Sequence, residues 1–303
     1  MDAVRRFLDG DVFYSFKHSP ATLTAAIVVV ICIFAAVFAQ WVAPHNPFDL
    51  KTLNLLDAFT PPAWTVNGTR NYLLGTDDQG RDVLSAIIFG SRMSLIIGLL
   101  ATLLAMVFGV SMGLVSGYAG GKLDAFIMRV ADIQLSFPAI LIALLIDGVA
   151  RVVLPKGSHD QLAVYVLVLA IAASGWVGYA RTVRGSTLVE RNREYVQAAR
   201  VIGRHPLAIM FSHVLPNVLG PVLVIGTLQI GAAIITESAL SFLGVGVPPT
   251  QPSLGTLIRI GNDFLFSGEW WITVFPGTAL VILVLSINVL GDWLRDALNP
   301  RLR

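Results

Sequence analysis

Long apolar stretches recur along the chain and are separated by polar segments. Each stretch has about 20 residues with few charges, the length that an α-helix needs to cross the hydrocarbon core of a bilayer. The pattern predicts an all-α fold, a polytopic membrane protein with six transmembrane helices. An even number of crossings places both termini on the same side of the membrane. The predicted spans are residues 21–43, 93–118, 124–148, 161–180, 214–236 and 270–291.

Composition supports the membrane interpretation. Hydrophobic residues make up 55% of the 303 residues, charged residues only 13%, and the mean hydropathy is +0.74. Soluble domains have about 45–50% apolar residues and about 25% charged ones, so this composition excludes a soluble domain. The single cysteine, Cys32, lies inside the first predicted span, which excludes an internal disulfide.

Lysine and arginine are unevenly distributed over the two sides of this topology. Positive residues accumulate on the cytoplasmic side of a membrane. With the N-terminus inside, thirteen of them are cytoplasmic, seven are outside, and Arg129 stays within a span. Both termini are therefore predicted to be cytoplasmic. The cytoplasmic set is Arg5, Arg6, Lys17, Lys122, Arg181, Arg184, Arg191, Arg193, Arg200, Arg204, Arg295, Arg301 and Arg303, and the outer set is Lys51, Arg70, Arg81, Arg92, Arg151, Lys156 and Arg259.

This topology defines the domain organisation. Residues 1–20 form a cytoplasmic N-terminal segment, whose charges and aromatic side chains are typical of a helix lying on the inner membrane surface. Residues 21–303 form one transmembrane domain. Two longer polar connections belong to it, an extracytoplasmic loop over 44–91 and a cytoplasmic loop over 181–216.

The cytoplasmic loop contains a short amphipathic helix with a face of mainly small side chains. Small side chains on an exposed helix let the backbone of a partner approach closely, and the charges around them keep the loop out of the hydrocarbon. The pattern therefore predicts a docking site for another protein. The apolar face repeats at a spacing of three and four residues and consists of Tyr195, Ala198, Ala199 and Ile202.

Glycine and proline set the boundaries of this segment. Gly203 ends the first helix, and Pro206 begins a second one. Pro216 then separates the second helix from the fifth span. The loop is therefore predicted to be a pair of short helices between two spans.

Four glycines recur at a spacing of four in the second span and at its inner end. Small residues at this spacing allow helices to pack closely in lipid. The pattern predicts tight packing of the second span against a neighbouring span. The glycines are Gly109, Gly113, Gly117 and Gly121.

Ionisable groups at membrane depth are costly and often functional, and this singles out three residues in or at the end of predicted spans. Arg129 and Asp132 are three residues apart in the third span, and either neutralise each other or contribute to a translocation pathway. Glu237 closes the fifth span. Its carboxylate either faces a passage for a cationic amino group or caps the following short helix. Pro138 is expected to kink the third span.

No motif for chemistry on the chain itself is found. The P-loop pattern is absent, so no ATP site of that kind is predicted, and no catalytic, cofactor or metal residues are proposed. Asp77, Asp78 and Asp82 lack the spacing and the distal glutamate of an EF-hand loop and are predicted to form a solvated, helix-capping turn. The net charge of +2 gives no indication of nucleic-acid binding.

The cytoplasmic helix pair resembles the coupling loop of ABC-importer permeases. The family pattern is Glu-Ala-Ala, three residues, Gly, nine residues, then Ile-x-Leu-Pro. Two positions depart from it, because Gln197 replaces the glutamate and His213 the isoleucine. The matching residues are Ala198, Ala199, Gly203, Leu215 and Pro216.

Three further stretches narrow this resemblance to the C-type permease subunit of dipeptide and oligopeptide importers. They read LGTDDQGRDVLSAIIFGSRMSL, ESALSFLGVGVPPTQPSLG and GDWLRDALNPRLR. The resemblance implies the type I importer permease fold in a bacterial cytoplasmic membrane. It also implies a second, homologous permease as heterodimer partner, two ATP-binding subunits that hold ATP and Mg, and an extracytoplasmic substrate-binding protein.

The resemblance leads to a hypothesis of ATP-driven import by alternating access. ATP binding closes the ATPase pair, the helix over 197–203 transmits the movement, and the spans open the passage outward. The competing hypothesis is an ion-gradient-driven secondary transporter or channel for small solutes, which commonly has buried ionisable residues near the midplane. Within the resemblance the cargo stays open between dipeptides, oligopeptides, nickel chelates, glutathione and opines.

Overall fold

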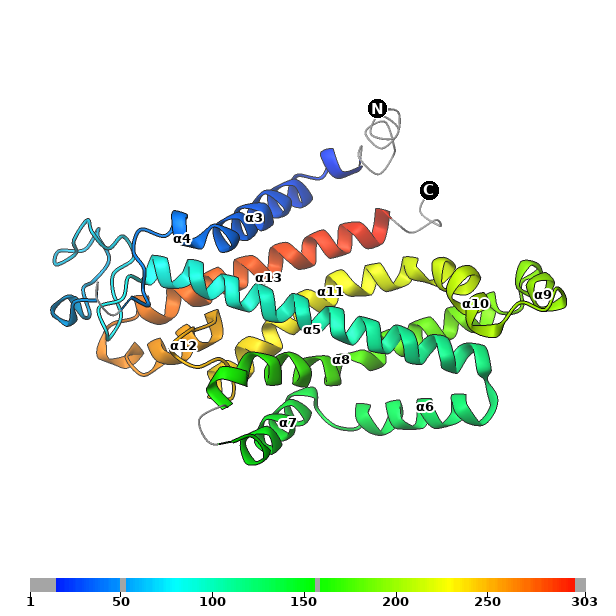
Figure 1. Ribbon diagram of the computed structural model, residues 1–303. Coiled ribbons are helices and arrows are strands. Elements are labelled where there is room, and N and C mark those ends of the chain that lie inside the picture. The colour runs from blue at the N-terminus through cyan, green and yellow to red at the C-terminus, as the bar shows by residue number, and fades with distance from the viewer. Residues whose placement is uncertain (1–14, 50–52, 156–158, 298–303) are drawn as a thin grey trace.

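Long helices run side by side along the molecule, with loops at one end and a short helix pair at the other (Figure 1). The computed structural model describes residues 15–49, 53–155 and 159–297. Within these ranges every regular element is a helix, and the one β-type pairing is an isolated bridge between Thr76 and Asp82. The predicted all-α class is confirmed.

In the described part of the chain, five helices are long and apolar enough to cross a membrane. A bent pair, α6 and α7, passes the same test only as one broken span, which brings the number to the predicted six. The elements are α3 (Pro20–Val37), α4 (Ala39–Val42), η1 (Leu55–Asp57), α5 (Val83–Ala119), α6 (Gly121–Leu135), α7 (Ala139–Val153), α8 (His159–Glu190), α9 (Glu194–Val201), α10 (Pro206–Ile209), the π-helical turn η2 (Met210–Val214), α11 (Leu215–Phe242), α12 (Leu254–Asn262), η3 (Leu265–Ser267) and α13 (Trp271–Ala297).

Side-chain caps fix where the first two long helices begin. The Ser19 side chain accepts a hydrogen bond from the backbone N–H of Thr22, and Pro20 follows at the first helical position, where its missing N–H costs nothing. Asp82 caps α5 by accepting a hydrogen bond of 2.9 Å from the N–H of Ser85. Helix α5 therefore starts ten residues before the predicted span and takes the last part of the predicted outer loop.

The acidic turn before α5 is buried, which corrects the prediction that it is solvated. Asp77 and Asp82 expose only 4% and 2% of their surface. Asp77 accepts a hydrogen bond of 2.6 Å from the Arg81 guanidinium, which is itself buried. The Asp77 carboxylate also accepts hydrogen bonds of 2.9 Å from the backbone N–H groups of Gln79 and Arg81, so the turn is held together from within.

Glycines allow α5 to lie directly against α8, as the spacing predicts. Each of three glycines on α5 faces the α8 backbone so closely that a side chain would overlap it. Gly121 does not share this role, because it begins α6 and a Cβ atom there would meet nothing within 4 Å. An added Cβ would lie 2.7 Å from the Tyr179 Cβ at Gly109, 2.9 Å from the Val183 Cβ at Gly113 and 2.7 Å from the Thr187 Cβ at Gly117.

The third predicted span is broken rather than kinked. Helix α6 ends at Leu135, α7 begins at Ala139, and the two helices meet at 94°. Pro138 is the cap of α7, since a proline cannot donate the N–H that would continue α6. Near the start of α6, the Arg184 guanidinium of α8 binds the Asp124 carboxylate through two hydrogen bonds of 2.5 and 2.7 Å.

Candidate functional site

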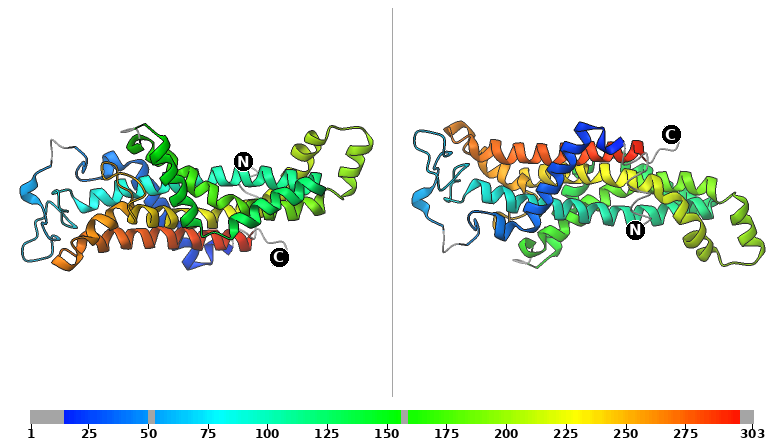
Figure 2. Two further views of the ribbon diagram at one scale, coloured as in Figure 1. Left: turned by 90° about the horizontal axis from the view of Figure 1, so that it is seen from below. Right: turned by 90° about the horizontal axis from the view of Figure 1, so that it is seen from above.

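Helix α9 and the turn after it project from the end of the bundle opposite the 43–82 loops (Figures 1 and 2). The helix spans Glu194–Val201, carries Glu194 in its first turn and Arg200 in its last, and so matches the helix dipole at both ends. At its end, the apolar side chains of Val201 and of the cap residue Ile202 are 86% and 79% exposed. A projecting helix with exposed apolar groups is a surface suited to a protein partner.

Gly203 ends this helix through its backbone conformation. Its φ of 77° lies in the left-handed region, where glycine carries no Cβ penalty. The N–H of Gly203 donates to the carbonyl oxygen of Arg200, and the N–H of Arg204 to that of Ala199, both at 3.0 Å. This pair of bonds is a Schellman motif, so the predicted helix end at Gly203 is confirmed.

We expect Gly203→Ala to loosen this turn, because an alanine at a positive φ costs about 1 kcal/mol. The measurement is limited proteolysis of the membrane-embedded protein, with faster cleavage between residues 190 and 206 as the expected result. Gly220→Ala is the matched control, since Gly220 lies within α11 and an added Cβ there would meet nothing within 4 Å. Equal cleavage of both variants would contradict the role given to Gly203.

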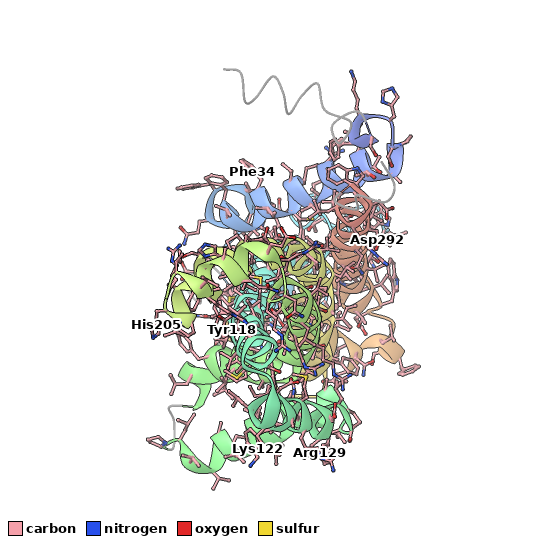
Figure 3. The ribbon with its side chains drawn as sticks, turned by 90° about the vertical axis from the view of Figure 1, so that its right-hand side faces the viewer. Phe34, Tyr118, Lys122, Arg129, His205 and Asp292 are labelled. Atoms are coloured by element: carbon pink, nitrogen blue, oxygen red, sulfur yellow. The ribbon has the colours of Figure 1, made fainter. Side chains whose placement is uncertain are left out.

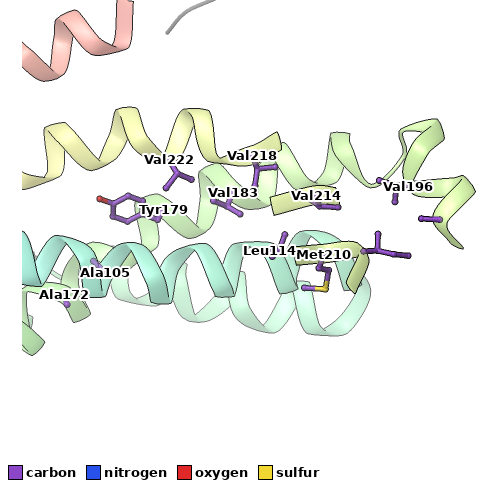
Figure 4. Packing of buried hydrophobic residues seen from close by; sticks show 12 residues of the cluster. Ala105, Leu114, Ala172, Tyr179, Val183, Val196, Met210, Val214, Val218 and Val222 are labelled. Carbon is purple, nitrogen blue, oxygen red and sulfur yellow. The ribbon is translucent and has the colours of Figure 1, made fainter. Parts of the chain in front are cut away.

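The predicted apolar face of α9 is divided between the bundle and the solvent. Ala199 is 4% exposed and packs with Val196, which is fully buried, into the cluster that joins α5, α8 and α11 (Figure 4). Tyr195 and Ala198 are exposed. The prediction of one docking face was therefore wrong in register. Val196 and Ala199 attach the helix to the bundle, whereas Ala198, Val201 and Ile202 are exposed.

Polar contacts hold α9 to the neighbouring helices. The Tyr195 hydroxyl donates a short hydrogen bond to Glu190 at the end of α8 and accepts one of 3.0 Å from the Asn217 side chain of α11. Partial burial, and then the neighbouring Glu190 carboxylate, raises the pKa of Tyr195 above its ordinary value, so the phenol keeps its proton at neutral pH. The Arg200 guanidinium lies 5.0 Å from the centre of the Tyr118 ring. Movement of α9 is thereby linked to three long helices.

The second short helix continues into the fifth span, so no boundary exists at Pro216. Helix α10, the π-helical turn η2 and α11 form one helical run from Pro206 to Phe242. Pro216 lies at the start of α11 and is exposed, and Leu215 is half-buried. The wider π-helical turn lies next to the position where Pro216 offers no N–H to the preceding turn.

Of the remaining predicted coupling residues, Gln197 is exposed and its side chain bonds locally, donating to the carbonyl oxygen of Asn192 at 3.1 Å. Sequence reasoning missed Val196, Arg200, Val201 and Asn217. Val196 and Val201 are apolar and stand next to residues of the predicted face, so a wider apolar face would have included them. The contacts of Arg200 and Asn217 are between helices and have no local sequence signal.

Arg129 and Asp132 are not partners, which corrects the predicted pair. The Asp132 carboxylate instead accepts a hydrogen bond of 2.5 Å from Arg181 of α8, and both side chains are about half exposed. Arg129 is exposed and points away from the bundle on α6, as does Lys122 (Figure 3). Asp132 thus links α6 to α8 at the exposed surface of the bundle.

Glu237 is completely buried near the outer end of α11, at 0% exposure. Its carboxylate accepts hydrogen bonds of 2.7 Å from the Ser241 hydroxyl and 3.0 Å from the Ser94 hydroxyl of α5. Ser94 in turn accepts a hydrogen bond of 3.2 Å from the N–H of Leu254 at the start of α12. Glu237 therefore does not cap α12 directly, because Ser253 does. It supports that helix start through Ser94.

Within the described ranges, no group of three or more His, Cys, Asp or Glu side chains is arranged to hold a metal ion. The arrangement at α9 offers a mechanical function rather than a chemical one. It is a short helix, attached on one face, free on the other, and joined to helices that cross the membrane.

Comparison with known proteins decides the family. Residues 105–303 match the family described as the inner membrane component of binding-protein-dependent transport systems. The chain belongs to this family. Residues 10–62 also match the N-terminal transmembrane domain of oligopeptide transport permease C. This inner-membrane permease is therefore a membrane component of an ABC transporter, in which ATP hydrolysis lies in other subunits.

Similar permeases align over nearly the whole chain. The dipeptide transport system permease protein DppC of Escherichia coli K12 is 40% identical, with 97% of this chain and 93% of that protein covered. The di/tripeptide transport system permease DppC of Pseudomonas aeruginosa is 38% identical over 97% and 92%. The oligopeptide transport system permease OppC of Bacillus subtilis is 37% identical over 97% and 90%.

The fold of this permease is shared with a solved ABC transporter. A chain from inward-facing conformations of the MetNI methionine ABC transporter matches with a TM-score of 0.56 at 19% identity, covering 71% of this chain and 96% of that one. At this identity the likeness concerns the fold alone. It agrees with the importer permease fold that the sequence resemblance implies.

Proposed function

We propose that this permease carries di- or oligopeptides inward across the bacterial cytoplasmic membrane. The observation that carries the proposal is the projecting helix α9, in a chain whose relatives are peptide transport permeases. In this proposal, the permease works with a second homologous permease, two ATP-binding subunits that hold ATP and Mg, and an extracytoplasmic substrate-binding protein. The binding protein delivers the peptide from outside.

In this proposal, α9 and both termini lie in the cytoplasm. Phe16 and Trp293, near the described ends of the chain, contact each other edge-to-face with ring centres 5.0 Å apart. The first turn of α3 and the last turn of α13 lie toward the side of the bundle from which α9 projects (Figure 1). The excess of Lys and Arg assigned to this side favours the cytoplasm. The segment over 1–14 lies outside the described residues.

The mechanism is alternating access driven from α9. A binding event shifts a conformational equilibrium only by the difference in its contacts with the two states. The ATP-binding subunits therefore have to bind α9 in both states and displace it as a rigid unit. The buried side chains of Val196 and Ala199 transmit this displacement to the bundle, because they pack against its helices. The residues proposed to form the coupling site are Tyr195, Gln197, Ala198, Ala199, Ile202, Gly203, Leu215 and Pro216, and those proposed near the pathway are Arg129, Asp132 and Glu237.

The test is Ile202→Asp, which places a charge on the most accessible apolar part of the coupling site. We expect uptake of a labelled dipeptide to fall by about tenfold or more, with loss of the ATP-binding subunits on copurification, since a charge buried at an interface is costly. The matched control is Leu56→Asp, because Leu56 is 92% exposed at the opposite end of the molecule. The control is expected to keep the ATP-binding subunits.

Two outcomes would count against the proposal. Normal uptake and normal copurification for Ile202→Asp would remove α9 from the coupling role. Peptide transport by the purified permease without any ATP-binding subunit, driven by an ion gradient, would support the competing class of secondary transporter.

A further inference from the structure

An apolar groove runs between α3 and the rest of the bundle. Side chains from α3, α5, α11 and α13 line it, among them Ile33, Leu95, Ile230 and Leu290, and its volume is about 660 Å³. This volume is within the range of about 300–1,000 Å³ that is usual for ligand sites. All four helices belong to membrane spans, so the groove opens at membrane depth.

A second hollow adjoins the outer end of the groove. It has a volume of about 560 Å³ and includes the polar side chains of Asn46, Thr250 and Gln251. Arg92 and Ile96 line both the groove and this hollow. The two spaces therefore form one amphipathic site, apolar within the span and polar toward the outer loops.

Arg92 is the charged group where the two spaces meet. No hydrogen bond or ion pair to it is found among the residues that the structure describes, although an arginine is always charged in proteins. It lies nine residues after the start of α5, about 14 Å along the helix axis, and the exposed Trp41 lies just beyond the outer end of α3. Tryptophans gather at the membrane–water interface, and Arg92 lines the second hollow together with Asn46 and Gln251 of the connecting loops, so it lies at the loop end of the spans.

We propose that this site binds a phospholipid of the outer leaflet. Its acyl chain occupies the apolar groove, its phosphate binds the Arg92 guanidinium, and the rest of the headgroup enters the polar hollow. The geometry of a guanidinium suits a phosphate through paired, charge-assisted hydrogen bonds. An apolar helix from a partner subunit fits less well, because it would bury Arg92 without a negative partner.

The test measures phospholipid bound to the full-length chain, purified with its partner subunits and stripped of lipid. Phosphatidylglycerol is added back and counted by native mass spectrometry. We expect Arg92→Ala to weaken its retention by about tenfold or more, the loss that follows from removing a charge-assisted contact, whereas Arg92→Lys retains part of it. Arg70→Ala is the matched control, since Arg70 is an exposed outer cation that lines neither space.

A second variant tests the groove without touching the charge. Ile33→Trp fills the apolar space from α3 and is expected to lower phosphatidylglycerol retention with Arg92 intact. Diacylglycerol, which lacks the phosphate, is expected to bind the unmodified chain weakly. Retention unchanged by Arg92→Ala or by Ile33→Trp, equal binding of diacylglycerol, or cross-linking of Ile33→Cys to a partner subunit would each overturn the proposal.

Discussion

Gly113→Val is expected to leave little folded permease in the membrane. An added Cβ would overlap the carbonyl oxygen of Ala180 and lie 2.9 Å from the Cβ of Val183, so α5 and α8 would have to separate. Overpacking of this kind costs about 1–3 kcal/mol and occasionally more. Here the overlapping atom belongs to the backbone, which cannot relieve the overlap by changing rotamer. The expected result is a loss of about 3 kcal/mol and of most monodisperse protein.

The matched control for this variant is Gly185→Val. Gly185 lies on α8, is exposed, and an added Cβ there would meet nothing within 4 Å. Both variants add the same side chain to a long helix, so the difference between them isolates the helix contact. Yield after size-exclusion chromatography and the thermal unfolding midpoint are the measurements. Similar values for the two variants would show that the α5–α8 approach is looser than described.

Glu237→Ala is expected to give the second large loss. It removes the acceptor of the Ser94 and Ser241 hydroxyls in a site with 0% exposure and leaves a cavity behind. A buried polar group without a partner costs about 1–3 kcal/mol, and the cavity adds to this. We expect the free energy of unfolding to fall by about 3 kcal/mol, together with faster hydrogen exchange at the start of α12.

Two further variants separate the hydrogen bonds from the volume. Glu237→Gln keeps the size and one acceptor oxygen, so its loss is expected to be smaller than that of the alanine variant. Glu194→Ala removes an exposed glutamate from the first turn of α9 and is expected to cost less than about 1 kcal/mol, the size of a helix-dipole contact at the surface. If Glu237→Ala were as stable as Glu194→Ala, the carboxylate would have no structural role.

The spans were predictable because a bilayer demands long helices with few charges, and the chain contains apolar stretches of that length. Helix ends were less predictable. Helix α5 starts at Val83 because Asp82 caps it, well before the chain becomes apolar. The 94° break at Pro138 was expected only as a kink, since hydropathy averages over both halves and gives no angle.

The site was predictable where a single residue determines the local backbone conformation. Gly203 was recognised because a helix end at positive φ favours glycine. The face of α9 was misjudged because periodicity shows which residues share a face but not which face meets the bundle. The partner of Asp132 was missed because Arg181 is 49 residues away in sequence, and sequence spacing favoured the local Arg129.

The helical run from Pro206 to Phe242 connects the segment after α9 directly to the fifth span, so a movement at one end is transmitted to the other. At 1.5 Å per residue its 37 residues reach about 55 Å. Asn217, which is bonded to Tyr195, lies in the third of the run nearer α9, and Glu237 lies five residues before the other end. Pro216, Pro221 and the π-helical turn all lie in the half of the run nearer α9, so the run bends most easily there. A displacement of α9 is therefore expected to rotate the straighter part of α11. This rotation would change how α12 packs at the other end of the bundle.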